Sequence, residues 1–192
     1  MREQAARRIG NLYPKARLPD GTEATTIAWI WARTVRSPDP MSRGAHVPLV
    51  SSFMLSEKRR VQAWVEPVID QGTHSYRFQT RTGALEPSER ARLKRGTKSS
   101  RGYFGCVLTG APISYEYIDA EANAGRMSVT LMAVVAETRS ARVYLAPTPE
   151  QEQAARSAVP HWRPGEPCRG TFASNAQGRP YGFTSFGDYF TP

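Results

Sequence analysis

One stretch near the N-terminus decides the fold of this chain: Thr25-Thr-Ile-Ala-Trp-Ile-Trp-Ala-Arg-Thr-Val35. β-Branched and aromatic residues dominate it, and such residues favour strands. Alternate side chains of a strand share one face, so Ile27, Trp29, Trp31 and Arg33 are expected to lie together. The stretch therefore predicts a β-strand from which the rest of the fold can be worked out.

Further strands are predicted on both sides of this one. Residues 75–82 alternate Tyr76 and Phe78 with Arg77 and Gln79, which is the pattern of a half-buried strand. The other strands are expected at 46–55, 60–70, 113–118, 128–137 and 141–146. A hairpin turn is expected at 70–72, and the last two strands should pair around residues 139–140. A helix over 127–138 is the competing interpretation.

Helices are expected to be few and short. Residues 2–10 are typical of a helix that ends at Gly10. Thr148-Pro-Glu-Gln151 is a helix start, with Thr148 as N-cap and Gln151 completing a capping box, and this helix should run to about residue 157. The predicted fold is α+β and β-rich, with antiparallel hairpins and two or three short helices. We divide the chain into a lead-in (1–24), a β-rich module (25–148) and a short helix with an irregular aromatic tail (149–192).

The positive charge is concentrated in the first half of the chain. The protein has 192 residues and a formal net charge of +9. Residues 1–101 hold 19 basic and 9 acidic residues, a net of +10, and the remainder holds 7 and 8, a net of −1. A basic half of this kind attracts polyanions through phosphate contacts. A merely solvated basic face is the alternative.

Residues 83–102 concentrate the basic side chains in one polar segment. We expect an exposed loop with a helical turn near Glu89, and the alternative is a flexible solvated loop without a ligand. The candidate nucleic-acid contacts are Arg90, Arg92, Lys94, Arg95, Lys98 and Arg101.

Two turns resemble the knuckles of a zinc ribbon in their spacing. Ser37 and Ser42 stand at the spacing of a C-x4-C knuckle, and Cys106 and Thr109 at that of a C-x2-C knuckle. Zinc is held by four thiolate or imidazole ligands, whereas neutral hydroxyls bind it poorly. With one thiol among four positions, no metal is expected.

No catalytic constellation emerges from the sequence. The histidines His46, His74 and His161 are far apart and in unrelated contexts, and no phosphate-binding, dinucleotide or nucleophile motif occurs. Glu116, Asp119 and Glu121 lie close in sequence, but their directions should diverge. The tryptophans Trp29, Trp31, Trp64 and Trp162 could stack on bases, although packing in the sheet is the favoured interpretation.

Eight ordered segments resemble one protein family over essentially the whole chain. They are Ile9-Gly-Asn-Leu-Tyr-Pro14, Thr26-Ile-Ala-Trp-Ile-Trp-Ala-Arg-Thr-Val35, Ala45-His-Val-Pro-Leu-Val-Ser-Ser-Phe53, Ala63-Trp-Val-Glu-Pro-Val68, Gly125-Arg-Met127, Leu131-Met-Ala-Val-Val-Ala-Glu137, Arg142-Val-Tyr-Leu145 and Phe186-Gly-Asp-Tyr-Phe-Thr-Pro192. Together they resemble the adenine-specific DNA methylases that carry a zinc-ribbon insert. Those are bacterial and archaeal enzymes, some of them associated with anti-phage defence.

The resemblance implies a segment of such an enzyme and not its catalytic core. The family uses S-adenosylmethionine and carries Asp-Pro-Phe-x-Gly-x-Gly and Asp-Pro-Pro-Tyr motifs, neither of which is present here. The chain resembles the stretch between those motifs. Where zinc-binding members have cysteines, Ser37, Ser42 and Thr109 stand here, while Cys106 is kept, so the resemblance implies a degenerate zinc-ribbon-like module without metal. No catalytic, cofactor or metal residue is carried over.

Two functions follow as hypotheses. In the first, the chain is the DNA-contacting insert of a DNA adenine methyltransferase, with DNA, the methylase core or other defence-system subunits as partners. In the second, it is a stand-alone interaction module or gene remnant that binds a protein through its aromatic tail and strand edges. A cytoplasmic location is expected, because no membrane span or signal peptide is visible. A free buried thiol is expected at Cys106, whose pairing with Cys168 the sequence leaves open.

Overall fold

The computed structural model describes the chain except for residues 1, 59–60, 100–101, 158, 168–182 and 190–192. Its described residues form four α-helices and ten strands, and all pairings between strands are antiparallel. The predicted β-rich α+β class is confirmed. The helices are α1 (Arg2–Ile9), α2 (Pro87–Arg95), α3 (Tyr115–Asn123) and α4 (Pro149–Ser157). The strands are β1 (Ala16–Arg17), β2 (Glu23–Arg36), β3 (His46–Leu49), β4 (Met54–Lys58), β5 (Val61–Asp70), β6 (Ser75–Thr82), β7 (Tyr103–Gly105), β8 (Pro112–Ser114), β9 (Ser128–Glu137) and β10 (Arg142–Leu145).

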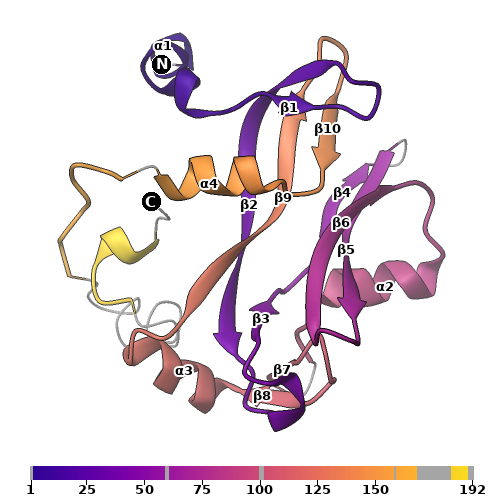
Figure 1. Ribbon diagram of the computed structural model, residues 1–192, viewed down its shortest axis with the longest axis vertical. Coiled ribbons are helices and arrows are strands. Elements are labelled where there is room, and N and C mark those ends of the chain that lie inside the picture. The colour runs from indigo at the N-terminus through magenta and orange to yellow at the C-terminus, as the bar shows by residue number, and fades with distance from the viewer. Residues whose placement is uncertain (1, 59–60, 100–101, 158, 168–182, 190–192) are drawn as a thin grey trace.

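β2, which contains residues 25–35, is the centre of the largest sheet. β2 pairs with β9 along most of its length, and the order is β1-β2-β9-β10, with β3 also pairing with β2. β4, β5 and β6 form a second sheet, and β7 and β8 a small ribbon. In Figure 1, α4 lies across β2 and β9, α2 lies beside the second sheet, and α3 lies near the ribbon. None of the described helices has the length and apolar character needed to cross a membrane.

Several predicted elements are confirmed. β6 spans the predicted residues 75–82, and the Asp70 carboxylate accepts a hydrogen bond from the Gly72 amide in the turn before it. β9 and β10 form the predicted hairpin, so the alternative helix over 127–138 is wrong: β9 instead supplies a row of buried side chains between two neighbouring strands. The helix over 2–9 is also present, although Gly10 continues into a 3-10 turn without left-handed φ.

Two predicted strands are wrong in part. The expected strand over 46–55 is split into β3 and β4, which belong to different sheets. The break follows from local bonding, because the Ser52 hydroxyl accepts from the Met54 amide and Val50 bonds to Thr97. The expected strand over 113–118 ends at Ser114, whose hydroxyl accepts from the Tyr117 amide and caps α3. This cap outweighs the β-propensity of Tyr115 and Tyr117.

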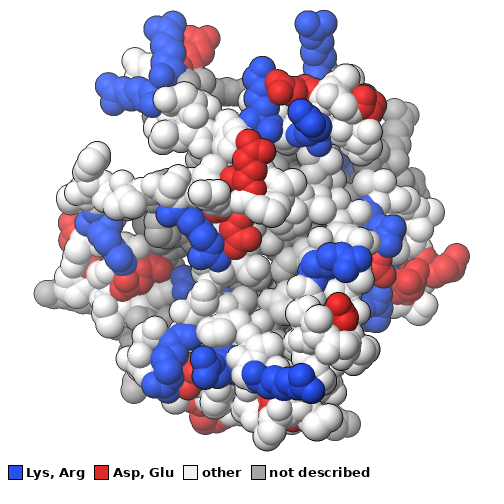
Figure 2. Space-filling model, viewed as in Figure 1, with Lys and Arg blue, Asp and Glu red and all other residues white. Residues whose placement is uncertain are grey.

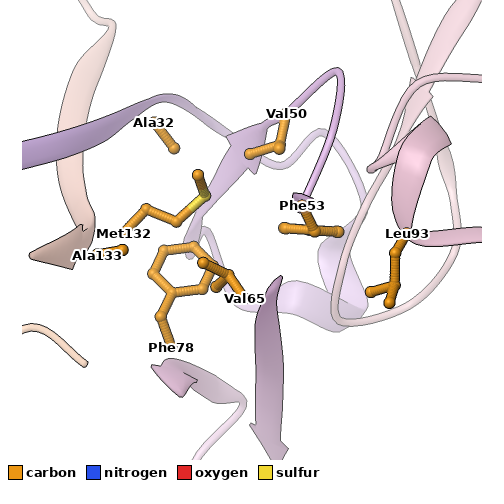
Figure 3. Packing of buried hydrophobic residues seen from close by; sticks show 8 residues of the cluster. All are labelled: Ala32, Val50, Phe53, Val65, Phe78, Leu93, Met132 and Ala133. Carbon is orange, nitrogen blue, oxygen red and sulfur yellow. The ribbon is translucent and has the colours of Figure 1, made fainter. Parts of the chain in front are cut away.

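The main hydrophobic cluster joins the two larger sheets and α2. Its buried members come from β2, the break after β3, β5, β6, α2 and β9, and they are Ala32, Val50, Phe53, Val65, Phe78, Leu93, Met132 and Ala133. Figure 3 shows their side chains converging from these separate segments. A second cluster packs the two knuckle turns against α3, with Val35, Val47, Phe104 and Ile118 in it. The fold therefore fixes both α2 and the knuckles rigidly to the sheets.

Candidate nucleic-acid interface

Four of the six predicted basic contacts lie on a helix, α2, and not on a loop. The helix begins with Pro87 at its first turn, and its one buried residue, Leu93, is 1% exposed within the main cluster. The Leu93 carbonyl accepts from the Phe53 amide at 2.8 Å. The loop expected from its polarity is thus corrected to a helix held by a single apolar side chain.

Gly96 sets the end of α2 against the sheet. Its φ of +57° favours glycine, and a Cβ there would lie 2.2 Å from the Val50 carbonyl oxygen. Thr97 continues this contact, because its amide donates to the Val50 carbonyl at 2.8 Å. No side chain fits at position 96, because the end of α2 lies directly against the segment between β3 and β4.

The basic residues of α2 divide into two groups. Arg90 and Lys94 lie one turn apart and both contact Glu57 of β4, at 3.0 and 2.6 Å. Their hydrogen bonds, Lys94 first and then Arg90, hold the pKa of Glu57 below its usual value. This carboxylate therefore competes with any phosphate for these two cations.

The second group faces solvent without such a partner. Arg92, Arg95 and Lys98 are exposed, and none lies within 4 Å of a carboxylate in the part of the chain that the structure describes. Lys98 lies beyond the end of α2, after Gly96 and Thr97, and its amide donates to the Arg95 carbonyl. Arg101 lies outside the described residues. Three cations thus remain available for an external anion.

The tryptophans of β2 pack against other side chains, which is the interpretation that the sequence favoured. Trp29 stacks on Tyr13 with ring centroids 4.5 Å apart and donates to Gln151 at 2.7 Å. The Arg156 guanidinium lies 5.7 Å from the Trp31 ring. Trp64 packs against the main cluster, whereas Trp162 is 73% exposed. The β2 tryptophans are therefore not open stacking platforms.

Gln151 has a role that its sequence position did not reveal. The Thr148 hydroxyl accepts from the Gln151 amide, as predicted for the N-cap. The side chain does not complete the predicted capping box: it accepts from Trp29 and donates to the Pro14 carbonyl at 3.0 Å. It is 3% exposed. Gln151 thus joins the lead-in, β2 and α4, and only the fold brings these partners together.

The two knuckle turns face each other. The Ser37 hydroxyl donates to the Cys106 sulfur at 3.4 Å, and Thr109 bonds to both Asp39 and Cys106. Ser42 is fully buried, with its hydroxyl on the Asp39 carbonyl at 2.6 Å. One thiol and three hydroxyls do not fit zinc, which binds thiolates and imidazoles. Hydrogen bonds and packing hold the turns instead.

Cys106 is a buried free thiol, and Cys168 lies outside the described residues. Burial raises the pKa of Cys106, but hydrogen bonds from Ser37, Thr109 and the Leu108 amide outweigh this effect, so the pKa is lowered overall. Backbone amides that point at the sulfur are the arrangement expected of a knuckle. With 3% exposure, the thiol is nevertheless shielded from solvent.

The structure brings together two histidines that the sequence analysis treated as unrelated. His46 and His74 both line a groove of about 610 Å³ between β6 and β9. The acidic trio lies on α3 and not on a strand end and loop as expected; there Glu121 is buried against Arg126, while Glu116 and Asp119 serve no shared site. Among the described residues, no group of three or more histidine, cysteine and acidic side chains could hold a metal.

The chain was compared with protein-family models, curated proteins and solved structures. No family model matches the chain, and neither a curated protein nor a solved structure matches it. The placement of the basic side chains and the resemblance of the sequence segments are therefore the observations that bear on function.

Proposed function

We propose that this chain is the DNA-contacting insert of an adenine-specific DNA methyltransferase, with α2 as its phosphate-binding element. One observation carries the proposal: Arg92 and Arg95 of α2, and Lys98 just beyond its end, are exposed and have no carboxylate within 4 Å among the described residues. Arginine and lysine contacts to phosphates position a protein on DNA without reading its sequence. The role is thus to hold DNA and not to choose the target base.

The methyl transfer itself belongs, in this proposal, to a catalytic core outside the chain. That core would bind S-adenosylmethionine, and the present chain would supply the surface that keeps DNA in place. The cytoplasm is where such a protein would meet DNA. The facing knuckles at Ser37 and Cys106 support the resemblance to a degenerate zinc ribbon, because they lie on separate hairpin ends as two knuckles do.

Charge reversal on α2 tests the proposal. We expect Arg92→Glu/Arg95→Glu to weaken binding of the whole chain to duplex DNA by about sixty-fold or more at about 0.1 M salt, because each lost phosphate contact costs about eight-fold through counterion release. Arg7→Glu/Arg139→Glu is the matched control, since both arginines are exposed and lie on other elements. Fluorescence anisotropy gives the affinities. Equal losses in both variants would show that overall charge, and not α2, drives binding.

A protein-binding function is the second candidate, favoured by exposed apolar side chains after α4. Val159 and Trp162 are 79% and 73% exposed. Such residues are typical of interaction sites. If the chain binds no DNA and self-associates in a concentration-dependent manner, and Trp162→Ser abolishes that association, the protein-binding function replaces the DNA-binding one.

A further inference from the structure

His46 and His74 line a groove between the two larger sheets. One wall is His74 with the first residues of β6, as far as Gln79, and the other is the start of β9 from Ser128 to Leu131. The residues before and within the first turns of α4 close one end, and Thr34, Ala45 and His46 the other. In Figure 2 the surface between the two sheets is largely uncharged, with both basic and acidic side chains around it. Its volume, about 610 Å³, is in the range of ligand sites, and no residue of α2 lines it.

Polar groups in the groove have spare hydrogen-bonding capacity. Within the described chain, no hydrogen bond involves the Tyr76 hydroxyl or the His74 ring. Burial raises the pKa of Tyr76, so its phenol stays protonated and can donate. His46 is bonded to Thr34 through Nδ1 at 3.3 Å, which leaves its Nε2 atom for another partner. The groove thus offers a planar polar ligand two imidazoles, several hydroxyls and the part of the Tyr76 ring that lines it, while the rest of this ring packs against the main cluster and lies edge-on to Phe78. Arg77 and Glu152 also line the groove and bring one charge of each sign.

Positive charge gathers at the His46 end. Arg126 donates three hydrogen bonds to the Glu121 carboxylate, the shortest at 2.6 Å. The pKa of Glu121 is lowered first by these hydrogen bonds and further by the charges of Arg126, Arg36 and His46. The Arg36 carbonyl in turn accepts from the Tyr117 hydroxyl at 2.9 Å. Arg126 therefore binds the Glu121 carboxylate directly, and Arg36 acts on it through its charge. Arg36 pairs with His46 between β2 and β3, so its positive charge lies beside the His46 end of the groove, although neither arginine lines the groove itself.

From this arrangement we propose that the groove binds one nucleotide of a single-stranded nucleic acid. Its base lies against Tyr76 between the sheets, and its phosphate lies at the Arg36 and Arg126 end. Stacking on an aromatic ring combined with a neighbouring positive charge is how single strands are bound without sequence preference. A duplex cannot enter, because its bases are paired and stacked. This site goes beyond the proposed function, since it lies on β6 and β9, apart from the duplex-binding surface of α2.

Binding of a fluorescent oligothymidine to the whole chain tests the site. We expect Tyr76→Ala to weaken binding by roughly 5- to 150-fold, the range for loss of one stacking partner. Arg36→Gln should lower the salt slope for the single strand by about 0.7, the value for one phosphate contact. Tyr144→Ala on β10 is the matched control, because Tyr144 is partly buried and does not line the groove.

Two further measurements keep the test decisive. If Tyr76→Ala fails to fold, His74→Asn replaces it, because asparagine tolerates the φ of +51° at this position. Photo-crosslinking of the unmodified chain to a strand with 5-iodouracil should label the peptide that contains Tyr76. Crosslinks confined to other peptides, or unchanged affinity in the groove variants, would overturn the proposal. Duplex binding separates the two sites: the groove variants should leave it intact, whereas the α2 variant should weaken it by about sixty-fold or more.

Discussion

Glu57 provides a test in which removing a negative charge should strengthen DNA binding. Its Oε2 atom contacts both Arg90 and Lys94 of α2, at 3.0 and 2.6 Å. If α2 binds phosphates, this carboxylate acts as an internal competitor for two of its cations. Glu57→Gln removes the negative charge and releases both side chains toward an external phosphate.

The expected gain follows from counterion release. Each added phosphate contact steepens the dependence of log K on log salt by about 0.9, which corresponds to about eight-fold in affinity at about 0.1 M salt. One released cation therefore gives about eight-fold tighter binding, and two give about sixty-fold. The fold should tolerate the change, because Glu57 is 45% exposed and exposed ion pairs contribute little to stability.

Glu66→Gln is the matched control for this experiment. Glu66 is 41% exposed, lies on β5 and pairs with Arg81 at 3.0 Å, so the substitution removes the same charge from a similar pair away from α2. Anisotropy titrations of duplex DNA at several salt concentrations measure both affinity and slope. Unchanged or weaker DNA binding by a folded Glu57→Gln variant would refute the role of α2. An equal gain in affinity for Glu66→Gln would show that net charge alone explains the effect.

Three further predictions concern the fold around the sites. Leu93→Ala should destabilise the chain by about 3–5 kcal/mol, because Leu93 is the one buried residue of α2 in the core. Urea unfolding measures this change in the free energy of unfolding. A loss below about 1 kcal/mol would mean that contacts other than Leu93 hold α2 on the core. Hydrogen bonds, first from the Ser185 amide, lower the pKa of Asp188 to about 2. Since this folded-state pKa lies below the unfolded value, the stabilisation by Asp188 is present above about pH 4 and is lost as the pH falls toward about 2. The melting temperatures of the wild type and Asp188→Asn should therefore differ above pH 4 and converge near pH 2; a constant difference would contradict this. Finally, Ser37→Cys/Ser42→Cys/Thr109→Cys should rebuild a four-thiolate zinc site with Cys106. At zinc about 100-fold above its dissociation constant, the melting temperature should rise by about 5–10 °C. Adding Cys106→Ser to the triple variant should weaken zinc binding. A folded triple variant whose melting temperature does not change with zinc would argue against the zinc-ribbon resemblance.

Local patterns predicted the elements whose signals lie within a few residues. The alternation of residues 75–82 fixes β6, and Thr148 fixes the start of α4 through its own hydrogen bond to the Gln151 amide. The β9–β10 hairpin was also predicted, beside a competing helix over 127–138, because β9 contains several β-branched residues and a polar turn follows it. In these cases the local preference and the tertiary packing agree.

The rest depended on contacts that are distant in sequence. α2 has one buried residue in nine, so its amphipathic signal is weak, and the contact between Leu93 and Phe53 decides that it forms. The grouping of His46 with His74 arises because β3 and β6 belong to different sheets that meet across the groove. Likewise, Glu57 is remote from the basic segment in sequence, but in the fold its carboxylate pairs with Arg90 and Lys94. Counting charges along the chain therefore identified the basic segment but could not separate its paired cations from its unpaired ones.

The salt dependence of duplex DNA binding by the unmodified chain tests the central claim most directly. Three unpaired cations on and after α2 predict a slope of log K against log salt of at least about −2.7 between about 50 and 200 mM salt. A slope of this size, lost on charge reversal of α2, is the predicted result. A slope near zero, or no binding at the lowest salt concentration, would contradict a phosphate-binding role for this helix.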